Sequence, residues 1–209
     1  MSIDPNLPRS WKRDLIAVCL MAFASFVVET TLGLVLQPIL VKLFGPLTGG
    51  LVSAIPDAII VFLGIYLVPR LGSPTLFATL LLFLSSVTTS FGPPGLYKVA
   101  IGIGLGVTLD LWLLIFGRKK FSYILAVAFG FALSIWATYL AWGLFNVNQG
   151  KQLQDALRPH LWFLTVIYFL LGLVGASIGA WFFEKRLRRF SAIQELRGET
   201  SGIIGQSDQ

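Results

Sequence analysis

Long apolar runs separated by short polar segments dominate the chain. A helix of roughly 20 apolar residues is long enough to cross a bilayer. Six runs of about this length follow one another, and proline or glycine residues lie at their ends. The pattern predicts an all-α polytopic membrane protein with six transmembrane helices, at 14–36, 47–68, 73–92, 94–117, 121–145 and 160–183.

The composition strengthens this prediction. Of the 209 residues, 56% are apolar and 12% are charged, whereas about 25% of the residues of a soluble domain are charged. Residues 1–10 lack the basic start and small-residue cleavage site of a secretory signal, so we expect the first helix to be retained. The expected organisation is an N-terminal segment (1–12), a six-helix domain (13–185) and a basic, then polar, tail (186–209).

The distribution of Lys and Arg predicts the orientation. With six spans, four of the sixteen cations fall on one side of the membrane, namely Lys42, Lys98, Lys151 and Arg158. The other twelve fall on the side that carries both termini. Because cytoplasmic loops are enriched in Lys and Arg, both termini are predicted to be cytoplasmic. The net charge of +6 is thus a topology signal, and we predict no nucleic-acid partner.

Small residues at four-residue spacing predict close helix packing, because helices in lipid associate where their backbones can approach. Gly102 and Gly106 form such a ridge in the fourth span, and the sixth span has two, Gly172-Ala176-Ala180 and Gly175-Gly179. These ridges fit plain bundle packing, and some of them fit a membrane-embedded partner equally well.

Three acidic residues lie within the predicted spans, where an ionised side chain costs at least about 2.5–3.5 kcal/mol. Asp110 extends the ridge of Gly102 and Gly106, and we expect it to pair or hydrogen-bond between packed helices, with Arg118 and Lys119 near enough to attract it.

Asp57 is expected near the midplane, after Pro56, whose ring removes a backbone donor and kinks the helix. It fits a coupling site and a protonated structural acid equally well. The third acid, Glu29, is expected in the outer half of the first span.

Polar and aromatic residues are predicted to converge in the outer half of the bundle. Aromatic walls with a few polar groups suit a flat, partly polar small molecule. The candidate ligand-binding residues are Glu29, Tyr97, Lys98, Trp136, Tyr139, Asn146, His160 and Tyr168. The alternative is an interfacial aromatic belt with a snorkelling glutamate and lysine. Trp142 falls on another helix face and is expected to lie in the lipid belt.

Two segments resemble a transporter family. Residues 43–51 (LFGPLTGGL) and 92–98 (GPPGLYK), the latter followed by a glycine-rich helix to Asp110, are similar to the substrate-binding S-components of energy-coupling factor vitamin transporters, especially the thiamine-precursor members. Members often carry an Ala-x-x-x-Ala docking pair on the first helix, but here Ala17 is followed at i+4 by Met21. The resemblance implies six helices in a prokaryotic plasma membrane, an outer-half vitamin site, a membrane coupling subunit and two ATPase subunits.

The expected function is substrate capture for a small-molecule importer, with membrane lipid as a further partner. The chain has no GxxxxGK[ST] phosphate loop, so separate ATPase subunits must supply energy. With one His and one Cys, we predict neither an enzyme nor a metal or cofactor site. The alternatives are a proton- or ion-coupled carrier that uses Asp57 and Glu29, and a membrane scaffold protein.

Overall fold

Every regular element that the structure describes is helical, which confirms the all-α prediction. The computed structural model describes residues 11–44, 51–88, 94–145 and 150–190. The α-helices are α1 (Trp11–Phe44), α2 (Leu51–Leu67), α3 (Ser73–Leu84), α4 (Tyr97–Phe116), α5 (Lys120–Leu144), α6 (Gly150–Leu157) and α7 (Leu161–Lys185). Short 3-10 helices follow three of them, namely η2 (Ser85–Val87), η3 (Arg158–His160) and η4 (Leu187–Arg189).

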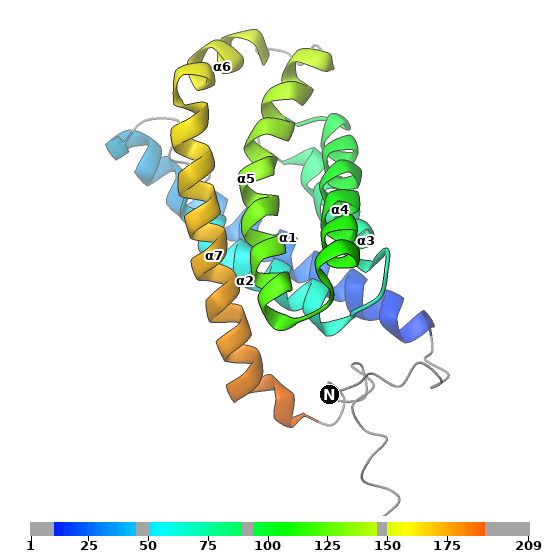
Figure 1. Ribbon diagram of the computed structural model, residues 1–209. Coiled ribbons are helices and arrows are strands. Elements are labelled where there is room, and N and C mark those ends of the chain that lie inside the picture. Colours follow the sequence, from blue (N-terminus) through cyan, green and yellow to red (C-terminus); the bar gives the residue numbers. More distant parts are fainter. Residues whose placement is uncertain (1–10, 45–50, 89–93, 146–149, 191–209) are drawn as a thin grey trace, which may run out of the picture.

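Four stretches of the described chain are long and apolar enough to cross a bilayer. They are Trp11–Leu36, Tyr97–Phe116, Lys120–Leu144 and Gln154–Arg189. Helices α4, α5 and α7 run side by side, α1 slants across them, and α6 lies at one end (Figure 1). Large apolar side chains point outward, among them Leu34, Leu114 and Trp162, which are 64–75% exposed. A surface of this kind indicates a multi-pass membrane protein.

The helix ends differ from the predicted spans at three places. Helix α1 continues past Pro38 to Phe44, as membrane helices often do at prolines. Helix α3 ends at Leu84 rather than at 92, because Ser85 and Ser86 begin a 3-10 turn and Thr88 is extended. The polar helix α6 lies in a stretch that was expected to be a loop. Helix α3 is thus shorter than the roughly 20 residues of a typical membrane span.

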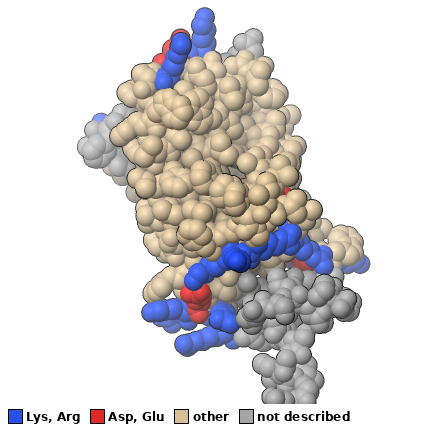
Figure 2. All heavy atoms as spheres, viewed as in Figure 1, with Lys and Arg blue, Asp and Glu red and all other residues tan. Residues whose placement is uncertain are grey.

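Four basic segments meet at one end of the bundle, here called the basic end. An ion pair of 2.9 Å joins Arg70 Nε before α3 to Asp14 Oδ2 near the start of α1. A second, of 2.7 Å, joins Lys120 Nζ at the start of α5 to Glu184 Oε1 near the end of α7. The Arg118 guanidinium donates to the carbonyl of Pro69. Figure 2 shows Lys and Arg as a band across this end, with an uncharged surface above it.

The glycine ridges are points of close helix contact, as predicted. A Cβ on Gly102 would lie 2.7 Å from the carbonyl oxygen of Ala78 in α3, and a Cβ on Gly175 would lie 2.7 Å from that of Ile55 in α2. A Cβ on Gly172 would lie 3.0 Å from Ala128 Cα in α5. Helix α4 therefore fits closely against α3, and α7 packs against both α2 and α5.

The larger apolar core fills the half of the bundle toward the basic end. The Tyr66 ring stacks on Phe62 and meets the rings of Tyr123 and Phe183 edge-on at 5.0–5.1 Å. A smaller cluster, which includes Tyr97 and Trp142, lies toward the opposite end. Buried Glu29, Ser85 and Lys98 lie in the same half of the bundle as this smaller cluster, where the sequence predicted a polar zone.

Candidate functional site

Glu29 and Lys98 meet around the end of α3. The side chain of Lys98 is fully buried, and its Nζ donates to the carbonyl oxygens of Ser85 at 3.0 Å and Thr88 at 2.8 Å. Ser85 Oγ donates to Glu29 Oε2 over 3.4 Å, and the Glu29 carboxylate also attracts the Lys98 ammonium. This Glu29–Ser85–Lys98 cluster joins α1, η2 and α4 in a buried site far from the basic end.

Lys98 places a positive charge at the carboxyl end of α3, where the helix dipole is negative. The last carbonyls of a helix lack intrahelical donors and carry partial negative charge. Water cannot satisfy such groups in the bilayer core, so each needs a partner within the protein. The Lys98 ammonium donates to the carbonyls of Ser85, the cap of α3, and Thr88, the cap of η2, and these bonds explain why a lysine is stable there with no exposed surface.

Asp110 places a negative charge at the amino end of the same helix, where the helix dipole is positive. Its Oδ1 accepts from the Gly72 amide at 2.8 Å, and its Oδ2 accepts from the amide and hydroxyl of Thr75 at 3.2 and 2.6 Å. The prediction that Asp110 bonds between packed helices is therefore confirmed. Among the described residues it forms no ion pair with Arg118 or Lys119, and Arg118 donates to the Pro69 carbonyl.

The two charges belong to one face of α4. Lys98, Gly102, Gly106 and Asp110 recur every four residues, and the two glycines between the charges let the α3 backbone lie directly against α4. The cation faces the carboxyl end of α3 and the anion faces its amino end, as the helix dipole favours. We call these four residues the α4 clamp.

Asp57 forms a separate buried acid in α2. It is 3% exposed, and its carboxylate hydrogen-bonds the side chain of Ser53 one turn earlier. Its Oδ1 has no hydrogen-bond partner among the described residues. Tyr168 of α7 lies close enough to interact with its charge. This places a carboxyl group with unused bonding capacity between α2 and α7.

Trp136 and Tyr139 of α5 bond residues of α7 and α6. Trp136 Nε1 donates to Thr165 Oγ1 at 2.9 Å, and its ring lies 5.2 Å from that of Trp162. The Tyr139 carbonyl accepts from Gln154 Nε2 of α6 at 2.6 Å. His160 is exposed at the start of α7, and Asn146 lies outside the described residues.

The Trp142 side chain is buried in the bundle, which differs from its predicted position. It is 6% exposed, and its Nε1 donates to the Tyr97 hydroxyl at 3.2 Å within the smaller apolar cluster. The expected position in the lipid belt is therefore wrong. The hydroxyl of Tyr97 gives the indole N–H a partner inside the bundle, which allows the tryptophan to be buried. Tyr97 precedes Lys98, so this bond also anchors the start of α4 to α5.

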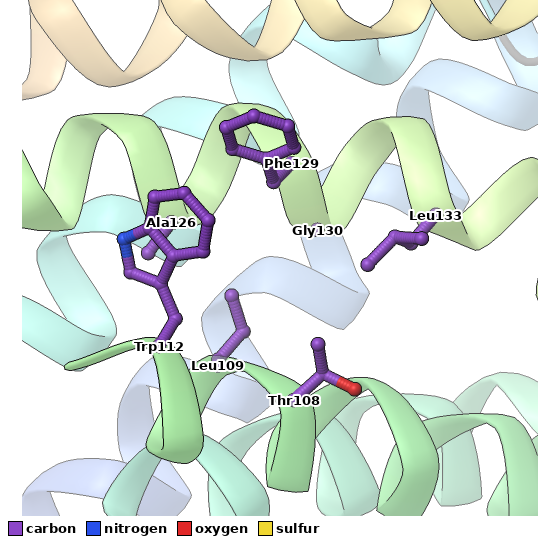
Figure 3. Close-up of a pocket in the computed structure, with 7 residues that line it drawn as sticks. All are labelled: Thr108, Leu109, Trp112, Ala126, Phe129, Gly130 and Leu133. Atoms are coloured by element: carbon purple, nitrogen blue, oxygen red, sulfur yellow. The ribbon is translucent and has the colours of Figure 1, made fainter. Parts of the chain in front are cut away.

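A pocket of about 60 Å³ lies between α4 and α5, and mostly apolar side chains from the two helices line it (Figure 3). It is lined by Thr108, Leu109, Trp112, Ala126, Phe129, Gly130 and Leu133. None of the eight predicted ligand-binding residues lines this pocket. The pocket therefore does not belong to the predicted ligand site.

Two residues of these sites were missed by the sequence analysis. Ser85 links Glu29 to Lys98, and Thr75 binds Asp110 through both its amide and its hydroxyl. Thr75 stands in the first turn of the predicted third span, where a hydroxyl residue often serves as a cap, whereas Ser85 lies inside that span, seven residues before its predicted end. That position was a usable signal for Thr75 alone. Comparison of the chain with protein-family models, curated proteins and solved structures finds no match.

Proposed function

We propose that this chain is the substrate-capture subunit of a small-molecule importer, with six spans and both termini in the cytoplasm of a prokaryotic cell. The observation that carries the proposal is the Glu29–Ser85–Lys98 cluster, where two opposite charges are buried far from the basic end. Buried charges in membrane segments typically mark substrate or ion paths. If the basic end is cytoplasmic, the cluster lies in the outer half.

The chemistry of the cluster suits a small ligand with both donor and acceptor groups. Glu29 offers carboxylate oxygens to a ligand donor, and Lys98 offers an ammonium group to a ligand acceptor. Tyr97, next to Lys98, adds an aromatic surface. A vitamin or vitamin precursor with a flat, polar ring matches these groups. Ligand entry would exchange the long 3.4 Å bond between Ser85 and Glu29 for bonds to the ligand.

The importer needs partners because the sequence contains no phosphate-binding loop. A transmembrane coupling subunit and two ATPase subunits would supply the energy for import. The capture subunit alone would still bind ligand, so binding is testable on the isolated chain.

Ligand capture predicts thermal stabilisation of the purified chain by one member of a panel of vitamins and precursors. A ligand at 100 times its dissociation constant stabilises the folded state by about 2.7 kcal/mol. Glu29→Gln should weaken binding at least about tenfold, because it removes a charged acceptor. Calorimetric titration of the hit against both proteins measures this ratio.

The matched control for this experiment is Glu184→Gln, which removes an exposed carboxylate of the Lys120 ion pair at the basic end. Its affinity should stay within about twofold of the wild type, because exposed ion pairs contribute little. Equal affinity in Glu29→Gln and the wild type would remove Glu29 from the site. A panel without any hit would count against capture as the function.

Asp57 favours a second candidate function, a proton- or ion-coupled carrier. Its buried Oδ1, which lacks a hydrogen-bond partner among the described residues, is suited to binding a proton or a small cation. For this function we expect solute uptake into proteoliposomes that is driven by a pH or sodium gradient and lost in Asp57→Asn. Uptake that requires added ATPase subunits, and that Asp57→Asn leaves intact, would contradict the carrier.

A further inference from the structure

Oxygen atoms hold the ammonium group of Lys98. Its Nζ donates to the carbonyl oxygens of Ser85 at 3.0 Å and Thr88 at 2.8 Å, and the nearby Glu29 carboxylate attracts its charge. Ser85 Oγ bonds Glu29 Oε2 over 3.4 Å and adds a hydroxyl to the set. Glu29, Ser85 and Lys98 are all buried. We call the oxygens of Glu29, Ser85 and Thr88 the oxygen cage.

The site combines fixed acceptors with a movable donor. The amide and hydroxyl of Thr88 donate to the Ser85 carbonyl at 3.1 and 3.0 Å, and these bonds fix the turn that carries both cage carbonyls. The Lys98 ammonium, in contrast, is the tip of a flexible four-carbon stem. Lys98 is the second residue of α4, at the end of the helix away from the basic end, so its stem can extend toward the membrane surface there. The cage oxygens therefore do not depend on Lys98 for their positions in the chain.

The chemistry of the cage selects one kind of occupant. Carbonyl and carboxylate oxygens accept hydrogen bonds and donate none, so they favour a group with several N–H donors. The Glu29 carboxylate also needs a positive charge beside it, because an uncompensated charge at membrane depth is costly. A primary ammonium supplies three N–H donors and one positive charge, as Lys98 does. A quaternary ammonium supplies the charge without a donor, and a hydroxyl supplies one donor without the charge.

We propose that the oxygen cage is a binding site for a primary ammonium group, which the Lys98 side chain fills in this structure and which the amine of a captured ligand takes over. The role in capture rests on the proposed function, whereas the ammonium site itself does not. The captured ligand is then an amine that is protonated at neutral pH. Tethering gives the Lys98 ammonium a high effective concentration at the cage, so the ligand must add contacts outside the cage to displace it.

Thermal unfolding of purified Lys98→Ala in detergent, with and without n-propylammonium chloride, tests the ammonium site. The substitution removes three carbons and one nitrogen from the side chain, and n-propylammonium contains the same heavy atoms. We expect Lys98→Ala to lower Tm by roughly 10 °C, because it leaves a buried carboxylate without its cation. About 100 mM n-propylammonium should restore at least about a third of this loss. The wild type should respond much less, because its own ammonium fills the cage.

Two controls isolate the cage. Tetramethylammonium chloride at the same concentration has the charge without N–H donors and should restore nothing, and Lys151→Ala, which removes an exposed lysine, should keep the wild-type Tm within about 1 °C. Equal responses of Lys98→Ala to the two salts, or none to n-propylammonium, would overturn the proposal. Folding of Lys98→Ala that requires n-propylammonium during purification would support it. Failure to fold even then, while Lys98→Ala/Glu29→Gln folds, would refute it.

The role in capture is tested on the wild type with the ligand that the thermal-stabilisation panel identifies. We expect this ligand to carry a primary amine, and its analogue with a hydroxyl in place of the amine to bind at least about tenfold more weakly. Equal affinity of the two would show that the captured ligand does not enter the cage. Rescue of Lys98→Ala without any panel hit would support the ammonium site and contradict capture, so the two failures are distinguishable.

Discussion

Replacing Asp110 with alanine is expected to lower the free energy of unfolding by about 3 kcal/mol. The change removes a carboxylate that accepts three hydrogen bonds from Gly72 and Thr75. Because these groups lie at the end of a helix inside the bundle, their amides would lose a partner that water replaces poorly. Reversible unfolding of the purified protein in detergent, followed by tryptophan fluorescence, measures the change.

Two variants separate the role of Asp110 from a general effect of substitution. Asp110→Asn keeps one oxygen acceptor without the charge, so we expect it to lose about half as much stability. Asp155→Ala changes an exposed acid in α6 and should stay within about 0.5 kcal/mol of the wild type. If Asp110→Ala were as stable as Asp155→Ala, the amino end of α3 would not depend on this carboxylate.

The α4 clamp shows which structural features can be predicted from a single sequence and which cannot. Helical periodicity placed Lys98 and Asp110 on the glycine ridge, because residues four apart share a helix face. Periodicity does not say which helix lies against that face. The nearest cations in sequence, Arg118 and Lys119, were therefore expected beside Asp110. The actual partners are the Thr75 hydroxyl and two backbone amides at the start of α3, and backbone amides leave no signal in side-chain composition.

The same limit applies to the aromatic residues. Trp136 and Trp142 both lie in the half of α5 away from the basic end, where an aromatic ring suits a lipid belt as well as a buried contact. Trp142 is buried because Tyr97 of another helix offers its hydroxyl. Such a pairing depends on tertiary packing, which a single sequence does not encode locally. Membrane-spanning runs were predictable because their hydropathy is a property of each segment alone.

The helix ends were harder to predict than the helices. Hydropathy remains high through residue 84 and beyond, but Ser85 and Ser86 compete for backbone hydrogen bonds and begin a 3-10 turn. In the opposite direction, Pro38 suggested the end of the first helix, although α1 continues to Phe44. The shortness of α3 has a structural consequence, because both of its ends lie against α4 and require partners there.

Gly106→Ala is expected to destabilise the protein by about 2–3 kcal/mol, although it adds a single methyl group. The new Cβ would overlap Thr75 Cα and lie 3.0 Å from the Thr75 amide nitrogen. These are backbone atoms, so the clash is relieved only if α3 and α4 move apart, which would also lengthen the bonds of Asp110 to Thr75. Gly104→Ala is the matched control, because nothing lies within 4 Å of a Cβ at that position. Equal unfolding free energies for the two variants in the same detergent would show that α3 does not depend on close contact with α4.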